Sequence, residues 1–354
     1  MTGEAWSSEP ERVEMITSDL FAHQSDAHSV IDRDFSFILR GGADARDDCA
    51  WFDFNGRGTL VFGSDYVRGA GFLLYELGHL GNFDVGYYLA AANISDLAAM
   101  GAVPLAMTTV VRYPKEFSDE DFRDVMLGIR ECTSRFKCPN VGGDIGTSDR
   151  LILSAAAVGV VREGSALTRT GAKVGDALML SGPTGVALAA MVYFEGKERQ
   201  GWSLAGSDEE ELLHSWRRVE PHVDLGQFLS ERGLATACQD TSDGLRATVE
   251  QLGTASNVRF EVDLSAVPVP AVVERVANLA GRDPYQIVFG GSVDFRLLFT
   301  VHPDRVSELP SSCIRIGTAR DLADAIPRSE PLPGVAWTHQ PDPLAGVRST
   351  EPPI

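Results

Sequence analysis

Apolar residues follow the helical period in two long segments of the first half of the chain. From 84 to 100 they line one side of a segment that ends at Gly101. From 118 to 137 they follow Ser118 and three acidic residues, an arrangement typical of a helix start. Runs of Val, Leu, Ala and other strand-forming residues lie outside these helices. They predict strands at 59–63, 105–111 and 151–161.

The alternation of strands and helices repeats after a polar, glycine-punctuated stretch at 162–175, where we expect a domain boundary. Strands are predicted at 177–180, 259–262 and 296–301, and helices after Gly185, near 209–218 and at 243–252. This alternation predicts an α/β or α+β protein of two domains. The expected organisation is an irregular arm with one helix at most, two domains and an extended proline-rich tail, at 1–45, 46–163, 164–325 and 326–354.

Composition narrows the function. The chain of 354 residues has 31 Lys and Arg against 50 Asp and Glu, a formal charge of −19, which argues against a nucleic-acid partner. No apolar stretch approaches the ~20 residues that span a bilayer, and the N-terminus lacks the features of a signal peptide, so we expect a cytoplasmic protein without a membrane partner. The five cysteines are odd in number and contain no C-x-x-C pair, which favours free thiols over disulfides or zinc.

Several common catalytic motifs are absent from the sequence. It has no G-x-x-x-x-G-K-[ST] loop, no G-x-G-x-x-G after a strand, no protein-kinase H-R-D or D-F-G segment, no G-x-S-x-G elbow and no H-E-x-x-H. The seven histidines are scattered along the chain. A site of another kind must therefore carry any catalysis.

Carboxylates recur near the predicted ends of elements. Asp96 lies in the last two turns of the helix 84–100, on the same face as Asn93, where the helix dipole disfavours a negative charge. The other positions are Asp47 and Asp48, Asp65 after a strand, Asp144 after a predicted Gly142-Gly143 turn, and Asp240 and Asp243 before a helix. Each alone is an ordinary turn or capping residue. Together they form an oxygen-rich, histidine-free set that points to Mg²⁺ and a nucleoside triphosphate.

Four segments carry a resemblance to a known family. They are Asn93-Ile-Ser-Asp-Leu-Ala-Ala-Met-Gly-Ala102, Val141-Gly-Gly-Asp144, Leu167-Thr-Arg-Thr-Gly-Ala-Lys-Val-Gly-Asp176 and Asp240-Thr-Ser-Asp-Gly-Leu245. In this order they closely resemble the signature segments of bacterial thiamine-monophosphate kinase, which belongs to the wider aminoimidazole ribonucleotide synthetase superfamily. The resemblance covers roughly residues 45–340.

The resemblance implies a homodimeric, cytoplasmic enzyme that binds ATP and Mg²⁺. Its N-terminal domain would carry a mixed sheet that forms a barrel-like dimer interface, and its C-terminal domain would be an α/β sandwich. The implied metal ligands are Asp47, Asp48, Ser64, Asp65, Asp96, Asp144, Asp240 and Asp243. The implied ATP contacts are Asn93, Gly142, Gly143, Arg169 and Ser242. Such an enzyme transfers a phosphoryl group largely by positioning and charge neutralisation.

The sequence departs from this family mainly where the acceptor would bind. The family's Gly-Gly-Glu-Asp-Tyr-Glu loop reads Gly290-Gly-Ser-Val-Asp-Phe-Arg296, one residue longer and without either Glu. A second acceptor segment has Arg68 in place of Glu and Gly71 in place of a substrate-contacting His. The family's Thr-Thr-Arg-Gly after Gly-Gly-Asp reads Ile145-Gly-Thr-Ser148, and Pro-x-Pro-Arg reads Val219-Glu-Pro-His222.

These differences lead to a hypothesis about the acceptor. Two carboxylates replaced by arginines favour an acceptor more anionic than thiamine monophosphate, contacted by Gly71, Ser292, Arg296 and Trp337. A hydroxyl acceptor would need a general base, for which Asp294 is the candidate. Three alternatives stay open: a true thiamine-monophosphate kinase, a synthetase in which ATP activates an oxygen for attack by nitrogen, and a non-catalytic nucleotide-binding scaffold. For Trp337, a role as an anchor of the tail is nearly as good an interpretation.

Overall fold

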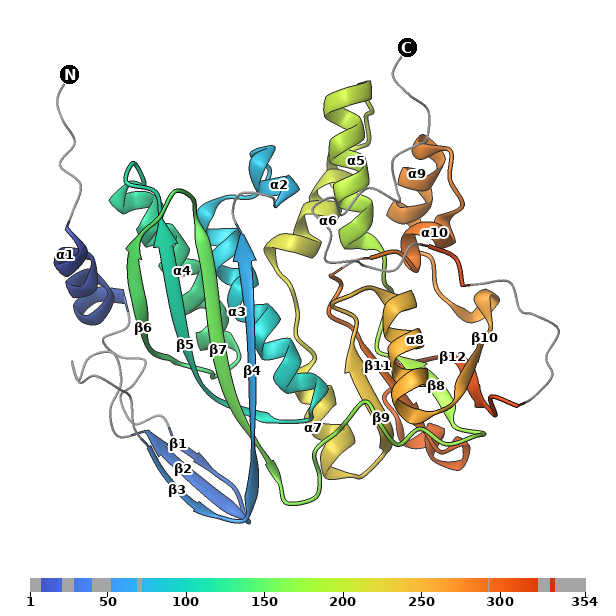
Figure 1. Cartoon of the computed structure of the whole chain (residues 1–354). Helices are drawn as coiled ribbons and strands as arrows, with labels where there is room; N and C mark the ends of the chain where they lie inside the picture. Colours follow the sequence, from blue (N-terminus) through green and yellow to red (C-terminus); the bar gives the residue numbers. More distant parts are fainter. Residues whose placement is uncertain are drawn as a thin grey trace. The chain divides into compact units, whose positions relative to one another are not determined.

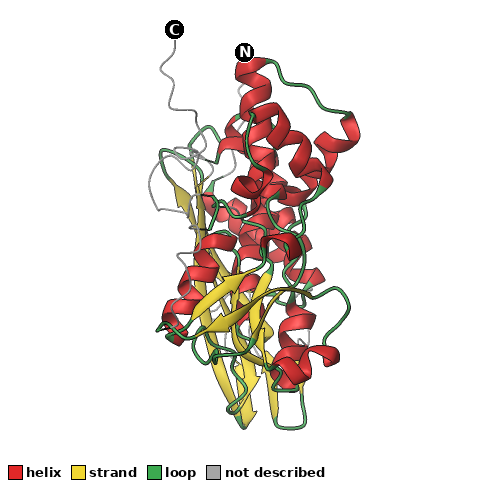
Figure 2. Cartoon of the chain, turned by 90° about the vertical axis from the view of Figure 1, so that its right-hand side faces the viewer, coloured by secondary structure: helices red, strands yellow, loops and turns green. Residues whose placement is uncertain are grey.

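The computed structural model describes residues 8–20, 29–39, 52–68, 72–291, 293–323 and 332–334 (Figure 1). Helices and strands are both abundant in it, which makes the protein a mixed α/β protein (Figure 2). The chain divides into two compact units. Unit 1 contains the described residues up to Ala166 together with Arg217–Glu231, and unit 2 contains Leu167–Trp216 and the described residues from Arg232 onward.

Unit 1 holds two sheets and the helices that cover them. Its elements are α1 (Glu9–Glu14), the π-helix η1 (Met15–Leu20), β1 (Ser29–Ile31), β2 (Phe35–Leu39), β3 (Phe52–Gly56), β4 (Gly58–Arg68), α2 (Leu73–Glu76), α3 (Asn82–Ala99), β5 (Val103–Tyr113), α4 (Asp119–Arg135), β6 (Asn140–Thr147), β7 (Ile152–Arg162) and α7 (Val223–Glu231). The larger sheet has the order β4-β7-β5-β6, with β5 and β6 parallel and the other pairs antiparallel. Strands β4 and β6 are therefore its two edges.

Helix α3 covers one face of the larger sheet and is itself covered by α4 and α7 (Figure 1). Its approach to α4 is close because glycines meet backbone there: a Cβ at Gly86 would lie 2.1 Å from the carbonyl oxygen of Val125, and one at Gly128 would lie 1.9 Å from that of Phe83. As a result, 14 of the 18 residues of α3 are buried, including polar Asn93 and Ser95.

The opposite face of the larger sheet is covered only in part. The three-stranded sheet β1-β2-β3 packs on one end of it, where Phe35 and Phe37 join Val158 and Val160 in one core cluster. Towards the other end, six side chains are exposed: Phe62, Ser64, Tyr66, Thr108, Val110 and Ala156. We call this area the open face. The opposite side of the sheet, against α3, is the helix face.

Unit 2 is built on an antiparallel sheet of order β10-β12-β8-β11-β9. Its elements are β8 (Ala177–Leu180), α5 (Val186–Gln200), α6 (Gly206–Arg217), β9 (Ala235–Asp240), α8 (Leu245–Ser256), β10 (Arg259–Val262), η3 (Leu264–Ala266), α9 (Ala271–Ala280), α10 (Pro284–Val288), β11 (Leu297–Val301), η4 (Pro303–Glu308) and β12 (Ile314–Arg320). Strands β8 and β11 are buried throughout, as expected for central strands. The two units thus have separate sheets.

The structure corrects three expectations about local structure. Strand β4 continues past Ser64 and Asp65 to Arg68, because its whole length pairs with β7. The segment Gly142-Gly143-Asp144 is not a turn but part of β6, held by pairing with β5. The region 1–45, expected to be an irregular arm, contains α1, η1, β1 and β2. Contacts with distant parts of the chain determine the secondary structure of these segments, and the local sequence pattern does not reveal those contacts. The predicted domain limits stay predictions.

No helix in the described segments is long and apolar enough to cross a membrane. The four described cysteines are free, and burial raises the pKa of the Cys138 thiol to about 12. Among the described residues the sheets are open, and the predicted barrel-like dimer interface stays a prediction.

Arg12 fastens α1 to the body of unit 1. Only 2% of its side chain is exposed. Its guanidinium lies 4.4 Å from the ring centre of Tyr113, and it donates to Asp119 Oδ1 at 2.9 Å and to the carbonyl of Phe117 at 2.6 Å. The contacts combine cation–π attraction with charge-assisted hydrogen bonds.

Replacing Arg12 with Met should therefore lower the free energy of unfolding by about 1–3 kcal/mol, because the aliphatic volume is kept while the charged contacts are lost. Thermal unfolding of this variant is compared with that of Arg33→Met, which removes the same charge from a 78% exposed side chain. Equal melting temperatures for the two variants would show that Arg12 does not fasten α1.

Candidate functional site

Helix α3 and strand β4 bring three of the predicted site residues together. Asn93 is fully buried: its Oδ1 accepts the backbone N–H of Asp65 at 3.0 Å, and its Nδ2 donates to the carbonyl of Leu89 at 2.9 Å. One turn along α3, Asp96 lies against β4, where its Oδ2 would be 3.3 Å from a Cβ at Gly63. The absence of a side chain at Gly63 thus makes room for the Asp96 carboxylate beside Asp65.

Sheet geometry separates the other predicted ligands of unit 1 from this pair. Asp65 lies on the helix face with Gly63 and Val67, whereas Ser64 lies on the open face. Asp65 pairs with Ala155 of β7, which pairs with Thr109 of β5, which pairs with Gly143 of β6. Asp65 and the Gly143-Asp144 segment are therefore at opposite edges, three strand spacings or about 14 Å apart.

The glycine directly before Asp144 is required by a close backbone approach. Gly143 has φ +153°, and a Cβ there would lie 1.7 Å from the carbonyl oxygen of Thr109. Asp144 is exposed, and its carboxylate forms an ion pair with Arg112 of the neighbouring strand β5. A backbone without side chains next to a carboxylate is suited to a phosphate and its metal ion.

In unit 2 the segment 240–244 begins with the last residue of strand β9 and leads into α8. Asp240 is buried and its Oδ1 accepts the Ser242 hydroxyl at 2.8 Å, while Asp243 Oδ2 accepts the Gln251 amide at 3.2 Å. Helix α8 begins after Gly244 with no side-chain capping bond. Ser242 and Asp243 are thus not used as helix caps, which removes the ordinary explanation for them.

The predicted acceptor loop packs against this segment within unit 2. The backbone N–H of Arg296 donates to Thr241 Oγ1 at 3.0 Å, and the N–H of Thr241 donates to the carbonyl of Arg296 at 2.8 Å. A Cβ at Gly244 would lie 2.2 Å from the carbonyl oxygen of Gly290. Buried Phe295 has φ +50°, which is strained for a residue with a side chain. The structure therefore joins two segments that the sequence treated separately.

Asp294 and Arg296 have definite structural contacts. The Asp294 carboxylate accepts the backbone N–H groups of Gly185 at 2.7 Å and Ala187 at 3.2 Å, at the start of α5. The Arg296 Nε donates to the carbonyl of Pro183 at 3.0 Å. Asp294 thus stabilises a helix N-terminus, a role that sequence reasoning missed, and its role as a general base stays a prediction.

The remaining predicted residues divide into two groups. Arg169 is exposed in unit 2, and its carbonyl accepts the Ser256 hydroxyl at 3.0 Å. Asp47, Asp48, Gly71, Ser292 and Trp337 lie outside the described residues, as does most of the proline-rich tail, and the side chain of Arg68 is not described. Among the described residues, no three His, Cys, Asp or Glu side chains gather closely enough to hold a metal ion.

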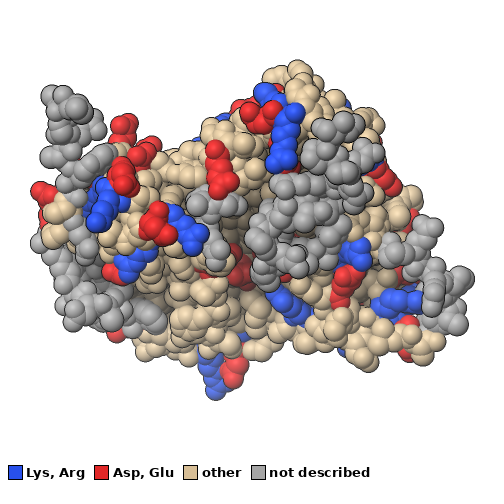
Figure 3. Space-filling model, turned by 45° about the horizontal axis from the view of Figure 1, so that its top comes forward, with Lys and Arg blue, Asp and Glu red and all other residues tan. Residues whose placement is uncertain are grey.

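The acidic excess is spread rather than concentrated on the face shown in Figure 3, where Asp and Glu are interspersed with Lys and Arg. Sequence reasoning missed Gly63, Arg112 and Gly146. The signal for Gly63 was its place two residues before Asp65 on a strand, which puts both on one face. Nothing in the sequence indicated that Arg112 and Asp144 are on neighbouring strands.

Comparison with known families matches both halves of the chain. Residues 46–161 match the AIR synthase related protein, N-terminal domain, and residues 173–324 match the C-terminal domain of the same family. Thiamine-monophosphate kinase of Pyrococcus abyssi is 29% identical over 226 residues, 64% of this chain and 68% of that protein. That of Methanopyrus kandleri is 31% identical over 226 residues, 64% and 69%. That of Methanospirillum hungatei is 27% identical over 311 residues, 87% and 99%.

Solved structures agree with this relationship. Thiamine-monophosphate kinase from Stenotrophomonas maltophilia K279a has a TM-score of 0.70 at 27% identity and covers 88% of this chain and 92% of its own. AaThiL complexed with AMPPCP and TMP has a TM-score of 0.66 at 20% identity, over 90% and 94% of the two chains, and supports the fold. The chain therefore belongs to the thiamine-monophosphate kinase family of AIR synthase related proteins, and it is an ATP-dependent, kinase-like enzyme.

Proposed function

We propose that this protein transfers the γ-phosphoryl group of ATP to thiamine monophosphate in the presence of Mg²⁺. The observation that carries the proposal is the arrangement of Asn93, Asp65 and Asp96. The buried side-chain amide of Asn93 holds the backbone of Asp65, and Asp96 lies beside Gly63. The names of the relatives and the AMPPCP and TMP bound by one related structure support this acceptor. They favour it over the altered acceptor that the sequence differences suggested.

The residues of this chain fit Mg²⁺ in chemistry. Asp65 and Asp96 offer only oxygen ligands, and the absence of a side chain at Gly63 makes room for the Asp96 carboxylate against β4. When bound, Mg²⁺ would neutralise phosphate charge and orient the transferred group. The protein's own contribution is to fix the carboxylates and to present the Gly142-Gly143 backbone to a phosphate. A phosphate acceptor is already nucleophilic, so this reaction requires no general base, which agrees with the capping contacts of Asp294.

A different acceptor is the second candidate, and it is favoured by the position of Arg296. The backbone N–H of Arg296 is hydrogen-bonded to Thr241, which lies between Asp240 and Ser242. Its guanidinium group lies beside Gly182 and Pro183. A positive charge placed beside a predicted ATP segment suits an anionic acceptor better than the cationic thiazolium.

We further propose that the enzyme acts as a homodimer through the larger sheet of unit 1. Phe62, Tyr66 and Val110 on the open face are 73%, 53% and 37% exposed, which is costly for large apolar side chains gathered on one face. Asp65 and Asp144 are on opposite edges and faces of one sheet, whereas ligands of one Mg²⁺ must lie within about 4 Å of each other. Pairing of edge β4 with edge β6 of a second copy would place Asp65 and the partner's Asp144 on neighbouring strands and close the barrel.

The first test concerns Asp96. The variant Asp96→Asn keeps the shape of the side chain and removes its charge, so kcat/KM should fall about 100-fold or more while the fold is kept. Asp224→Asn, which removes a charge from an exposed residue of α7, serves as the matched control. Steady-state release of ADP measures both. Equal activity of the two variants would contradict a role for Asp96 in the site.

The second test concerns the acceptor. Purified protein with ATP and Mg²⁺ should convert thiamine monophosphate to thiamine diphosphate, measured by chromatography of the products. Failure of this conversion, with ATP still bound, would favour the second candidate. In that case a mass-spectrometric screen should find a metabolite that gains one phosphoryl group, and Arg296→Glu should weaken its binding because the anion loses its counter-charge.

The third test concerns the dimer. The double variant Phe62→Glu/Tyr66→Glu places charges on the open face and should convert a particle of twice the chain mass of 38.2 kDa into a monomer in analytical ultracentrifugation. The monomer should also lose Mg²⁺-dependent nucleotide binding. Val174→Glu, at a 58% exposed position in unit 2, is the control. A wild-type monomer that binds Mg²⁺ and nucleotide normally would refute the dimer.

A further inference from the structure

Arg112 on β5 forms an ion pair with Asp144 that the family resemblance does not assign. The Arg112 side chain is 35% exposed and the Asp144 side chain is 61% exposed. Asp144 pairs in register with Val110, two residues before Arg112 on β5, so the carboxylate and the guanidinium lie on the same side of the sheet. A fixed guanidinium is thus placed next to a predicted metal ligand.

The neighbouring backbone is shaped for this guanidinium. Gly146 of β6 pairs in register with Arg112, and a Cβ at Gly146 would lie 2.4 Å from Arg112 Nη1 and 3.3 Å from its Cζ. The guanidinium therefore lies over Gly146, and a side chain at this position would force it to shift. Arg112 thus places a guanidinium on the strand adjacent to β6.

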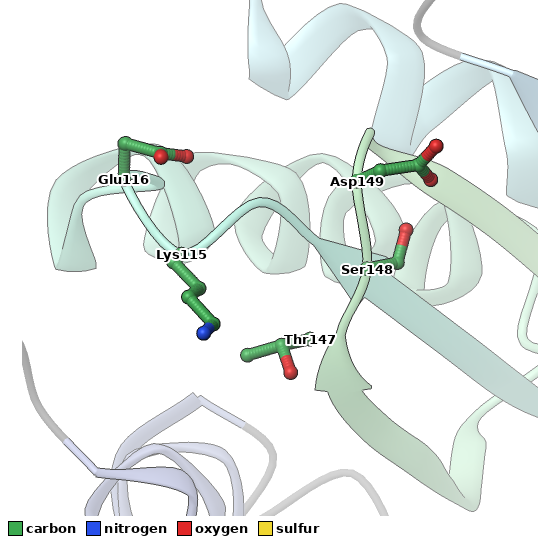
Figure 4. Close-up of a pocket in the computed structure, with 5 residues that line it drawn as sticks. All are labelled: Lys115, Glu116, Thr147, Ser148 and Asp149. Carbon is green, nitrogen blue, oxygen red and sulfur yellow. The ribbon is translucent and has the colours of Figure 1, made fainter.

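Strands β5 and β6 are parallel, and their carboxyl ends meet at a hollow of about 420 Å³. It is lined by Lys115, Glu116, Thr147, Ser148 and Asp149. Figure 4 shows the Lys115 ammonium pointing toward Thr147, while the carboxylate of Asp149 points away from that pair. Loops at the carboxyl ends of strands are where α/β folds bind ligands, and the residues that line this hollow supply one cation, two hydroxyls and two carboxylates.

We propose that Arg112 is a phosphate-binding residue for the nucleotide, with Lys115 as a weaker second cation at the same sheet end. This inference rests on the proposed function, because it takes the ligand to be a nucleoside triphosphate with Mg²⁺. Without ligand, Arg112 neutralises Asp144. With ligand, the Asp144 carboxylate would be free to hold the metal ion, and the guanidinium would donate to two oxygens of a phosphate in the planar geometry that arginine provides.

The exchange of partners makes Mg²⁺ and nucleotide respond in opposite ways to loss of the guanidinium. Nucleotide loses a charge-assisted hydrogen bond. Mg²⁺ alone no longer competes with a cation for Asp144 and should bind equally well or more tightly. A purely structural role for Arg112 would weaken both ligands together.

The test is calorimetric titration of the full chain with AMPPCP plus Mg²⁺, with Mg²⁺ alone, and with thiamine monophosphate alone. For Arg112→Ala, the Kd of AMPPCP should rise about 10- to 100-fold. Affinity for Mg²⁺ alone should not fall, and thiamine monophosphate affinity should be unchanged. Gly146→Ala keeps the charge but displaces the guanidinium, so it should weaken AMPPCP in the same direction. Arg150→Ala, which removes a positive charge from an exposed neighbouring residue, should bind AMPPCP as the wild type does.

The possible failures are distinguishable. Three results for Arg112→Ala would each overturn the role of Arg112: unchanged affinity for AMPPCP, equal weakening of AMPPCP and Mg²⁺ binding, or weakening of thiamine monophosphate binding alone. If the wild-type protein binds AMPPCP with Mg²⁺ in these cases, the proposed function still stands. A wild-type protein that binds no AMPPCP with Mg²⁺ would overturn the proposed function and this inference with it.

Discussion

The buried amide of Asn93 is the contact on which the site of unit 1 depends. It joins the middle of α3 to the backbone of Asp65 on β4. Because Asn93 is fully buried, solvent does not reach it to replace its hydrogen bonds to Asp65 and Leu89. Because α3 is buried between the sheet and α4, its rotation about its own axis and its position along β4 are fixed. That fixed position puts Asp96 over Gly63 and beside Asp65.

The larger sheet of unit 1 keeps two of the predicted metal ligands apart within one chain. Its strand order puts Asp65 and Asp144 on opposite edges and opposite faces, and the open face between them carries exposed aromatic side chains. A second copy would satisfy both features at once, because it would cover the apolar area and supply the missing edge. The proposed dimer and the proposed metal site are therefore one hypothesis rather than two.

The sequence predicts much of this protein, but unevenly. Helix α4 was predictable because it is a long amphipathic segment with a clear start signal, and α3 because its apolar residues follow the helical period as far as Gly101. The strand character of Gly142-Gly143-Asp144 was not, because glycines lack strand propensity and pairing with β5 alone holds them extended. Asp294 looked like a catalytic base, and only the fold shows that its oxygens accept N–H groups of α5. Arg112 escaped notice because its partner is 32 residues away.

A crystal structure of the protein with AMPPCP and Mn²⁺ in place of Mg²⁺ would locate each metal ion by anomalous scattering. We expect a peak beside the carboxylates of Asp65 and Asp96, with Asp144 of the partner subunit completing the site. A metal ion bound away from Asp65 and Asp96, or held with both of them in a monomer without any second chain, would contradict this expectation.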